Sequence, residues 1–251
     1  MRCKMKNKQV LVCATLLFLS AVITNAAEQE PEGPSAAGNR VRSNSEDSES
    51  AASCISVASF ESPEDLYQRA LGLIEGNPGR ARIILTRAGE LGHAESLYEL
   101  GQMFCYGEGG EVDLAKTRDC FARAGKLGHA ESLCRLGGMY CQGEGGDPDP
   151  FEGLNSFWMA SQRGHLEATN QVAQILYHGI TGPRNPEMAR AYALAAAERG
   201  NTAAQTLLSA MLYNGEGGDV DLDGAVFYAS AAAAKGSNDA IGFLAMLESE
   251  E

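Results

Sequence analysis

The chain has 251 residues, of which 44% are hydrophobic and 21% charged, and its formal net charge is −13 at pH 7. So acidic a chain repels phosphate backbones, which argues against a nucleic-acid partner and favours basic partners. No stretch after residue 27 is apolar enough to cross a bilayer, so no membrane span is expected in the mature chain.

The first 27 residues have the order of a secretory signal peptide. A basic opening, which includes Arg2 and Lys8, precedes the apolar run 10–23, and small residues follow up to Ala27. The alternative is a membrane anchor, but this run is shorter than the ~20 residues that a spanning helix needs. We therefore predict cleavage after Ala26 or Ala27 and export of the mature chain, which would be periplasmic or secreted.

Residues 28–60 are rich in Glu, Ser, Pro, Gly and Ala and nearly free of large apolar side chains. Such a segment buries too little apolar surface to offset its chain entropy, so the composition predicts a disordered tether, acidic and rich in serine. The folded part is expected to run from residue 61 to residue 251.

A repeat of 36 residues dominates the rest of the chain. The stretches GHAESLYELGQMFCYGEGG and GHAESLCRLGGMYCQGEGG lie 36 residues apart, and the same spacing separates His93, His129, His165, Asn201 and Ser237, each preceded by glycine. A period of this length is typical of a solenoid, in which each unit is too small to bury its own apolar face.

Each unit has the pattern of two helices. In the first helix, Leu100, Met103 and Phe104 form an apolar stripe at i, i+3 and i+4 that recurs 36 residues later. The second helix begins at a good N-cap residue, which in three units is followed by proline, as in Asn77-Pro78. The glycine before each periodic residue is suited to end that helix in a left-handed conformation.

The expected fold is all-α, an α/α superhelical solenoid of 36-residue helix-turn-helix repeats. It has about five helix pairs and a C-terminal capping helix. The expected units are 63–93 with a shortened internal turn, then 94–129, 130–165, 166–201 and 202–237, followed by an acidic final helix at 238–251.

The stretches HAESLCRLGGMYCQGEGGDPD, SQRGH and AYALAAAERGN resemble the Sel-like repeat (SLR) family, which is related to the tetratricopeptide repeat. The resemblance covers roughly residues 64–251 and departs from the family's pattern at Gly153 and Ser156. It implies a helical scaffold of the kind that serves as an adaptor in signalling, envelope assembly or host contact. Some exported, cysteine-rich members are described as binding or slowly hydrolysing β-lactams and related cell-wall pieces.

No motif for a nucleophile or for a phosphate-binding loop is found in the sequence. His93, His129 and His165 recur once per unit, and equivalent positions of stacked helices lie roughly 9–10 Å apart. This spacing is too wide for one zinc ion, whose ligands lie at ~2 Å. They are expected to be turn residues, and neither a metal, a cofactor nor an enzymatic activity is expected.

The cysteines offer two possible disulfides, because an exported chain meets an oxidising compartment. Cys120 and Cys134 flank the turn at Gly128 almost symmetrically, so an antiparallel helix pair would place them at similar depth. Cys105 and Cys141 lie one period apart and would pair if both faced the junction of adjacent first helices. Cys54 in the tether would be left unpaired, and the alternative that all the thiols are free and half-buried stays open. Cysteine-rich members of the resembled family carry a bridge in every unit, so the match to them is partial.

A polar stripe along the first helices, at i, i+4, i+7 and i+11, is the candidate binding surface. First helices usually line the concave groove of a helical solenoid, and side chains that vary from unit to unit suit an extended peptide or a partner's surface. The alternative is a merely solvated face. The candidate residues are Glu95, Glu99, Gln102, Tyr106, Glu131, Arg135, Gln142, Glu167, Gln171, Gln174 and His178.

Two hypotheses for the function follow from these patterns. The first is an exported, monomeric, non-enzymatic scaffold that holds another protein or an extended peptide in this groove. The second, which rests on the resemblance alone, is a protein that binds or hydrolyses β-lactams or cell-wall fragments.

Overall fold

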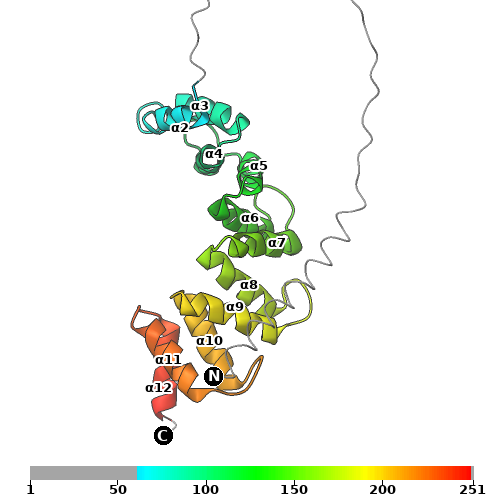
Figure 1. The fold of residues 1–251 in the computed structure, drawn as a ribbon, viewed down its shortest axis with the longest axis vertical. Coiled ribbons are helices and arrows are strands. Elements are labelled where there is room, and N and C mark those ends of the chain that lie inside the picture. Colours follow the sequence, from blue (N-terminus) through cyan, green and yellow to red (C-terminus); the bar gives the residue numbers. More distant parts are fainter. Residues whose placement is uncertain (1–60, 250–251) are drawn as a thin grey trace, which may run out of the picture. The chain divides into compact units, whose positions relative to one another are not determined.

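The computed structural model describes residues 61–249; the expected signal peptide, the expected tether and the last two residues lie outside this range. Residues 61–249 form eleven α-helices and no strand, which confirms the predicted all-α repeat fold (Figure 1). The helices are α2 (Pro63–Leu71), α3 (Pro78–Glu90), α4 (Ala94–Tyr106), α5 (Leu114–Lys126), α6 (Ala130–Gln142), α7 (Pro150–Gln162), α8 (Leu166–His178), α9 (Pro186–Glu198), α10 (Thr202–Asn214), α11 (Leu222–Ala233) and α12 (Asn238–Ser249).

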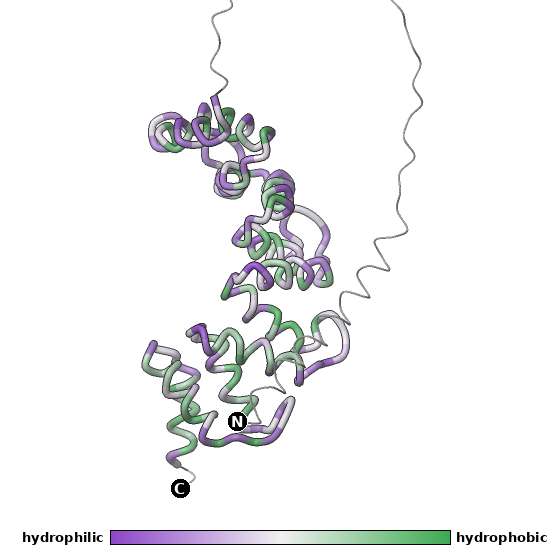
Figure 2. Tube along the Cα trace, viewed as in Figure 1, coloured by the Kyte–Doolittle hydropathy of each residue, from purple (hydrophilic) through white to green (hydrophobic). Residues whose placement is uncertain are grey.

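Each helix packs mainly against the helices that precede and follow it in the chain, from α2 against α3 to α11 against α12. Helices α2 to α11 form five successive pairs, and α12 follows as a single helix. Figure 2 shows hydrophobic and hydrophilic residues alternating along the tube, as expected for amphipathic helices. Each pair therefore completes its core only with its neighbours, which is the property of a solenoid.

The second helix of every pair begins at the predicted cap. The side chains of Asn77, Asp113, Asp149, Asn185 and Asp221 each accept a hydrogen bond of 2.9–3.1 Å from a backbone N–H in the first turn. A polar cap of this kind contributes about 1 kcal/mol to helix stability. Five local signals in the sequence thus set where these helices start.

The first helices are capped by the periodic residue itself, a role beyond that of the turn residue expected from the sequence. Nδ1 of His129 accepts a hydrogen bond of 3.1 Å from the backbone N–H of Ser132, and His93 and His165 make the equivalent contact. The glycines before the periodic residues have φ between 83° and 97°, the left-handed conformation predicted for them. Histidine here performs the role that Asn201 performs in the next unit.

Small residues let the two helices of a unit approach closely, as their recurrence predicts. A Cβ added to Gly137 on α6 would lie 2.8 Å from the ring of Phe157 on α7, and the same fit occurs one unit earlier. In the following unit the equivalent positions are Ala173 and Ala193, both fully buried. A glycine facing a phenylalanine is thus replaced by two alanines, so two small residues make the contact in that unit.

Basic side chains connect successive units. Arg190 on α9 donates a hydrogen bond of 2.9 Å to the carbonyl oxygen of Asp219 in the next loop. Arg199 reaches the carbonyl of Gly164 at 2.7 Å, and Lys235 makes the equivalent contact one unit later. The carbonyls of Gly164 and Gly200 follow the C-terminal ends of α7 and α9, where partial negative charge favours a cation. Several basic side chains are thus hydrogen-bonded across the junctions between units.

The last helix exposes more apolar surface than its acidic end suggests. Ile241 and Met246 are 49% and 39% exposed, while the acidic residues Asp239 and Glu248 lie near the two ends of α12. Ala245 on α12 is the equivalent of Gly137, the residue that packs against Phe157 of the following helix. Within the described residues no second helix follows α12 to cover Ala245. Residues 61–249 therefore end on an incomplete repeat.

Candidate binding site on the first helices

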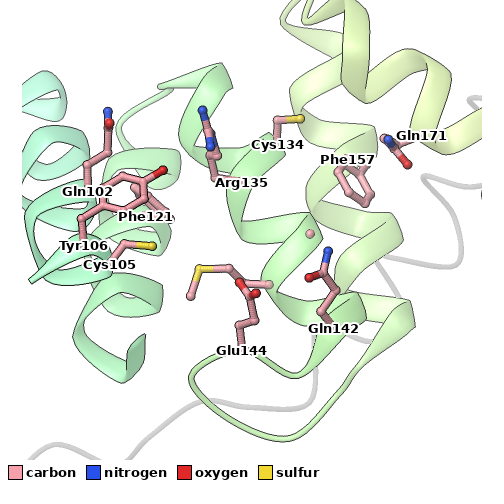
Figure 3. Close-up of a pocket in the computed structure, with 12 residues that line it drawn as sticks. Gln102, Cys105, Tyr106, Phe121, Cys134, Arg135, Gln142, Glu144, Phe157 and Gln171 are labelled. Atoms are coloured by element: carbon pink, nitrogen blue, oxygen red, sulfur yellow. The ribbon is translucent and has the colours of Figure 1, made fainter. Parts of the chain in front are cut away.

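Five of the eleven candidate residues surround one pocket of about 410 Å³. Gln102 and Tyr106 come from α4, Arg135 and Gln142 from α6, and Gln171 from α8. In Figure 3 the side chains from α4 lie on one side of the pocket, and those of Gln142 and Gln171 lie on the other. The stripe that periodicity predicts thus lies over a hollow shared by three consecutive units.

The floor of this pocket is apolar and comes largely from residues outside the predicted polar stripe. Phe121 on α5, Met139 on α6 and Phe157 on α7 are only 4–5% exposed, and their atoms line the pocket. The opening above them exists because Gly138 has no side chain: a Cβ added there would meet no heavy atom within 4 Å. The signal for this opening was present in the repeat, since Gln102 and Gln174 occupy the equivalent positions.

The rim of the pocket is polar. Three side-chain amides, those of Gln102, Gln142 and Gln171, offer both hydrogen-bond donors and acceptors. Tyr106 is 64% exposed and presents its ring and hydroxyl at the edge. The loop residue Glu144 adds a carboxylate that makes no hydrogen bond or ion pair with any described side chain. An apolar floor inside a rim of amides is a typical arrangement for binding a polypeptide.

The one cation of the pocket lining is neutralised within its own helix. Arg135 Nε donates a hydrogen bond of 2.9 Å to a carboxylate oxygen of Glu131, and the other oxygen of Glu131 lies 2.7 Å from His165 Nε2. Burial raises the pKa of Glu131, but the contacts with His165 and Arg135 outweigh it and hold the pKa below the ordinary value. Glu131 therefore links two units and is not free for a partner.

Two further glutamates of the predicted stripe lie outside the pocket lining. Glu167 accepts hydrogen bonds from Asn201 at 2.9 Å and from Gln171 at 3.0 Å, so it too joins neighbouring units. Glu99 makes no hydrogen bond with a described residue, and burial together with the nearby charge of Glu108 raises its pKa. A half-buried carboxylate without a cation is a site that a basic group of a partner would stabilise.

The remaining predicted residues lie elsewhere on the same helices. Gln174 lines a separate hollow with Thr202 and Lys235, and His178 is exposed with its ring 5.0 Å from that of Tyr177. Glu95 lies at the start of α4, where its carboxylate is 3.8 Å from His93. The stripe is therefore continuous along the first helices, but only its middle part surrounds the pocket above Phe121, Met139 and Phe157.

The expected disulfides are not formed in the structure: Cys105, Cys120, Cys134 and Cys141 are all free. Cys120 is buried in the core formed with α2, α3 and α4, whereas Cys134 packs on the core formed with α7 and α8. The two residues lie at similar depth along the turn, but their side chains face opposite neighbours. Likewise Cys141 points at its own second helix, because a Cβ added to Gly153 would lie 2.5 Å from its Sγ.

Burial keeps the thiols of Cys120 and Cys134 protonated. Burial raises the pKa of Cys120 to about 11 and that of Cys134 to about 12. Since the thiolate is the nucleophile, both groups are weakly reactive near neutral pH. Among residues 61–249 no cluster of His, Cys, Asp and Glu has the arrangement to hold a metal ion, and no helix is long and apolar enough to cross a membrane.

Comparison with known proteins gives a consistent result. The family model "Sel1 repeat" matches residues 52–93, 94–129, 130–155, 166–201 and 202–237. The structure is similar to that of a Sel1 repeat protein from Oxalobacter formigenes, with a TM-score of 0.69, 21% identity, and coverage of 73% of this chain and 77% of that one. It is also similar to a protective antigen from uropathogenic Escherichia coli with an SLR fold, with a TM-score of 0.68, 23% identity, and coverage of 71% of this chain and 39% of that one.

No curated protein matches the chain by sequence. The five family matches follow the repeat phase set by His93, His129, His165, Asn201 and Ser237, and the third match stops at residue 155. That stop lies where Gly153 and Ser156 depart from the repeat pattern. On the repeats, the helix pairs and the two structural likenesses together, the chain belongs to the Sel1 repeat family.

Proposed function

We propose that this chain is a non-enzymatic scaffold whose protein partner binds across the first helices at the pocket above Phe121, Met139 and Phe157. Proteins with Sel1 repeats generally mediate protein–protein interaction. The observation that carries the proposal is the pocket itself, which has an apolar floor, three amides on its rim and walls from three units. Such a hollow suits a protruding side chain of a partner, while the flanking first helices supply the wider contact surface.

The chemistry of the lining supports binding rather than catalysis. The residues that line the pocket include neither serine, threonine nor histidine; of its two thiols, Cys105 and Cys134, that of Cys134 has its pKa raised to about 12. An acyl-transfer reaction such as β-lactam hydrolysis needs a nucleophile with an adjacent base. Incubation of the full chain with a chromogenic β-lactam checks this point, and turnover above that of the buffer would contradict a purely binding role.

Export of the chain is part of the same proposal. The basic opening and the apolar run at 10–23 support a signal peptide, which would place the scaffold in the periplasm or outside the cell, where it acts as a monomer. Cell fractionation and N-terminal sequencing of the mature chain test this part. A mature chain that begins at Met1 and stays in the cytoplasm would contradict it.

The binding surface is tested by site-specific photocrosslinking in the cell of origin. A benzoylphenylalanine placed at Gln142, on the pocket rim, is compared with one at Gln162, an exposed residue at the end of α7 that does not line the pocket. We expect a covalent partner from position 142 and none from position 162. Crosslinks of equal yield from both, or from position 162 alone, would exclude the first-helix face as the binding surface.

A further inference from the structure

One position of the pocket lining differs from its equivalents in the units before and after it. Gln102 on α4 and Gln174 on α8 carry long side chains where Gly138 on α6 carries none. A Cβ at residue 138 would enter open space, whereas Cβ atoms at the neighbouring Gly137 or at Gly101 would collide with an aromatic ring. Gly138 is thus the glycine in this part of α6 that close helix packing does not require. Its effect is to leave the apolar floor uncovered.

Charge on the rim is unbalanced towards negative. In the last complete unit the loop glutamate Glu216 is paired with Arg184 at 3.3 Å. Glu144 holds the equivalent loop position beside the pocket, and no described cation is paired with it. Arg135 is already engaged with Glu131 at 2.9 Å. A cation brought by the partner therefore finds an unpaired carboxylate at Glu144, with the half-buried Glu99 on the preceding first helix.

We propose, on the basis of the function proposed above, that the partner is an extended peptide segment with one bulky apolar residue next to a lysine or arginine. The apolar side chain inserts over Gly138 onto Phe121, Met139 and Phe157. The basic side chain pairs with Glu144. The backbone of the segment hydrogen-bonds to the rim amides of Gln102, Gln142 and Gln171, since an amide side chain can both donate to a carbonyl and accept from an N–H. The overall acidity of the chain agrees with a basic segment.

Two substitutions at residue 138 separate pocket filling from helix stability. Gly138→Ala and Gly138→Gln both replace a helix-interior glycine by a better helix former. Only glutamine restores the long side chain found in the units before and after, at Gln102 and Gln174, and covers the floor. The third variant, Glu144→Gln, keeps the shape of the rim and removes its charge.

The experiment is a selection of random twelve-residue peptides displayed on phage against the immobilised full chain and its three variants. We expect selected peptides to share a bulky apolar residue with an adjacent Lys or Arg. They should bind Gly138→Gln at least tenfold more weakly than Gly138→Ala. On Glu144→Gln the preference for the basic residue should disappear while the apolar residue is kept.

Other outcomes overturn the inference. Peptides without the apolar residue, peptides that bind Gly138→Gln as tightly as Gly138→Ala, or a selection that yields no peptide would each contradict it. The cellular crosslink at residue 142 distinguishes this failure from failure of the scaffold proposal. If a partner crosslinks equally to the original chain and to Gly138→Gln, the scaffold proposal holds and insertion over Gly138 is refuted. If neither form gives a crosslink, both proposals are refuted.

Discussion

Nε2 of His165 lies 2.7 Å from a carboxylate oxygen of Glu131, so the N-cap residue of α8 is hydrogen-bonded to the first turn of α6 one unit earlier. The same relation joins Asn201 to Glu167 at 2.9 Å. Each contact couples the start of one first helix to the start of the next. Stability in a solenoid depends on such nearest-neighbour terms as much as on the units themselves.

Replacement of Glu131 by alanine should weaken the junction between its unit and the next. We expect Glu131→Ala to lower the free energy of unfolding by about 1 kcal/mol, since it removes a hydrogen bond to His165 and a partner of Arg135, both partly exposed to solvent. Urea denaturation followed by circular dichroism measures the change. Glu95→Ala is the matched control. Glu95 is the equivalent of Glu131 one unit earlier, but its carboxylate lies 3.8 Å from His93 of its own unit. An equal loss of stability in both variants would disprove the coupling.

His129 should make the stability of the array depend on pH. Its Nδ1 accepts the N–H of Ser132 at 3.1 Å, so capping requires the neutral ring. The groups that face it are Glu95, Glu131, His165 and the ring of Tyr98, whose centroid is 4.7 Å away. Burial lowers the pKa of His129 below its ordinary value of 6.5, against the opposing effect of the two glutamates.

The unfolded chain therefore binds a proton at this site at a higher pH than the folded chain does, so folded-state stability falls as pH drops below about 6.5. His129→Asn keeps a cap that does not titrate, as in the unit that starts at Asn201. We expect the loss of melting temperature between pH 7.5 and pH 5.5 to be smaller in His129→Asn than in the original chain. An identical loss in both would show that His129 does not contribute.

Two neighbouring glycines should respond in opposite directions to the same substitution. Gly137→Ala places a methyl group 2.8 Å from Phe157, which is buried and has little room to move, so we expect destabilisation by about 1–3 kcal/mol. Gly138→Ala meets open space and should stabilise α6 by up to about 1 kcal/mol. Thermal unfolding of the two variants decides the point. The same direction of change in both would contradict the packing described here.

The four cysteines of the described residues should stay unbridged in the protein isolated without reductant. Cys120 and Cys134 belong to different cores, and both thiols have raised pKa values, about 11 and about 12. Alkylation of the native chain near neutral pH should modify both slowly, and denaturation should make them reactive. Peptide mapping that finds a Cys120–Cys134 or Cys105–Cys141 bridge would refute this expectation.

Several parts of the structure could be read from short stretches of sequence. Helix starts at residues such as Asn77 and Asp149 follow from cap chemistry that acts within four residues. The left-handed glycines and the apolar stripes follow equally local rules. Of the alternatives open for the cysteines, the structure has the free thiols. Separation along the chain indicates depth and not direction, and Cys120 and Cys134 face different neighbours.

Only part of the candidate site could be predicted from the sequence in the same way. The period of the first helices identified Gln102, Tyr106, Arg135, Gln142 and Gln171, since solvent-facing positions recur with the helical repeat. It also selected Glu131 and Glu167, which serve as contacts between units. The role of Glu131 depends on His165, which lies 34 residues away and approaches it only after the units have stacked.

The repeat, its helix pairs and its polar stripe were determined by the sequence alone, because each rests on residues within one 36-residue period. Which polar residues remain free for a partner, and where the stripe opens into a pocket, was decided only by the tertiary structure. The pocket needs walls from three units, and its floor consists of Phe121 and Phe157, which have the same apolar character as any core residue. An opening is a property of the space between side chains, and that space is defined only when neighbouring units pack.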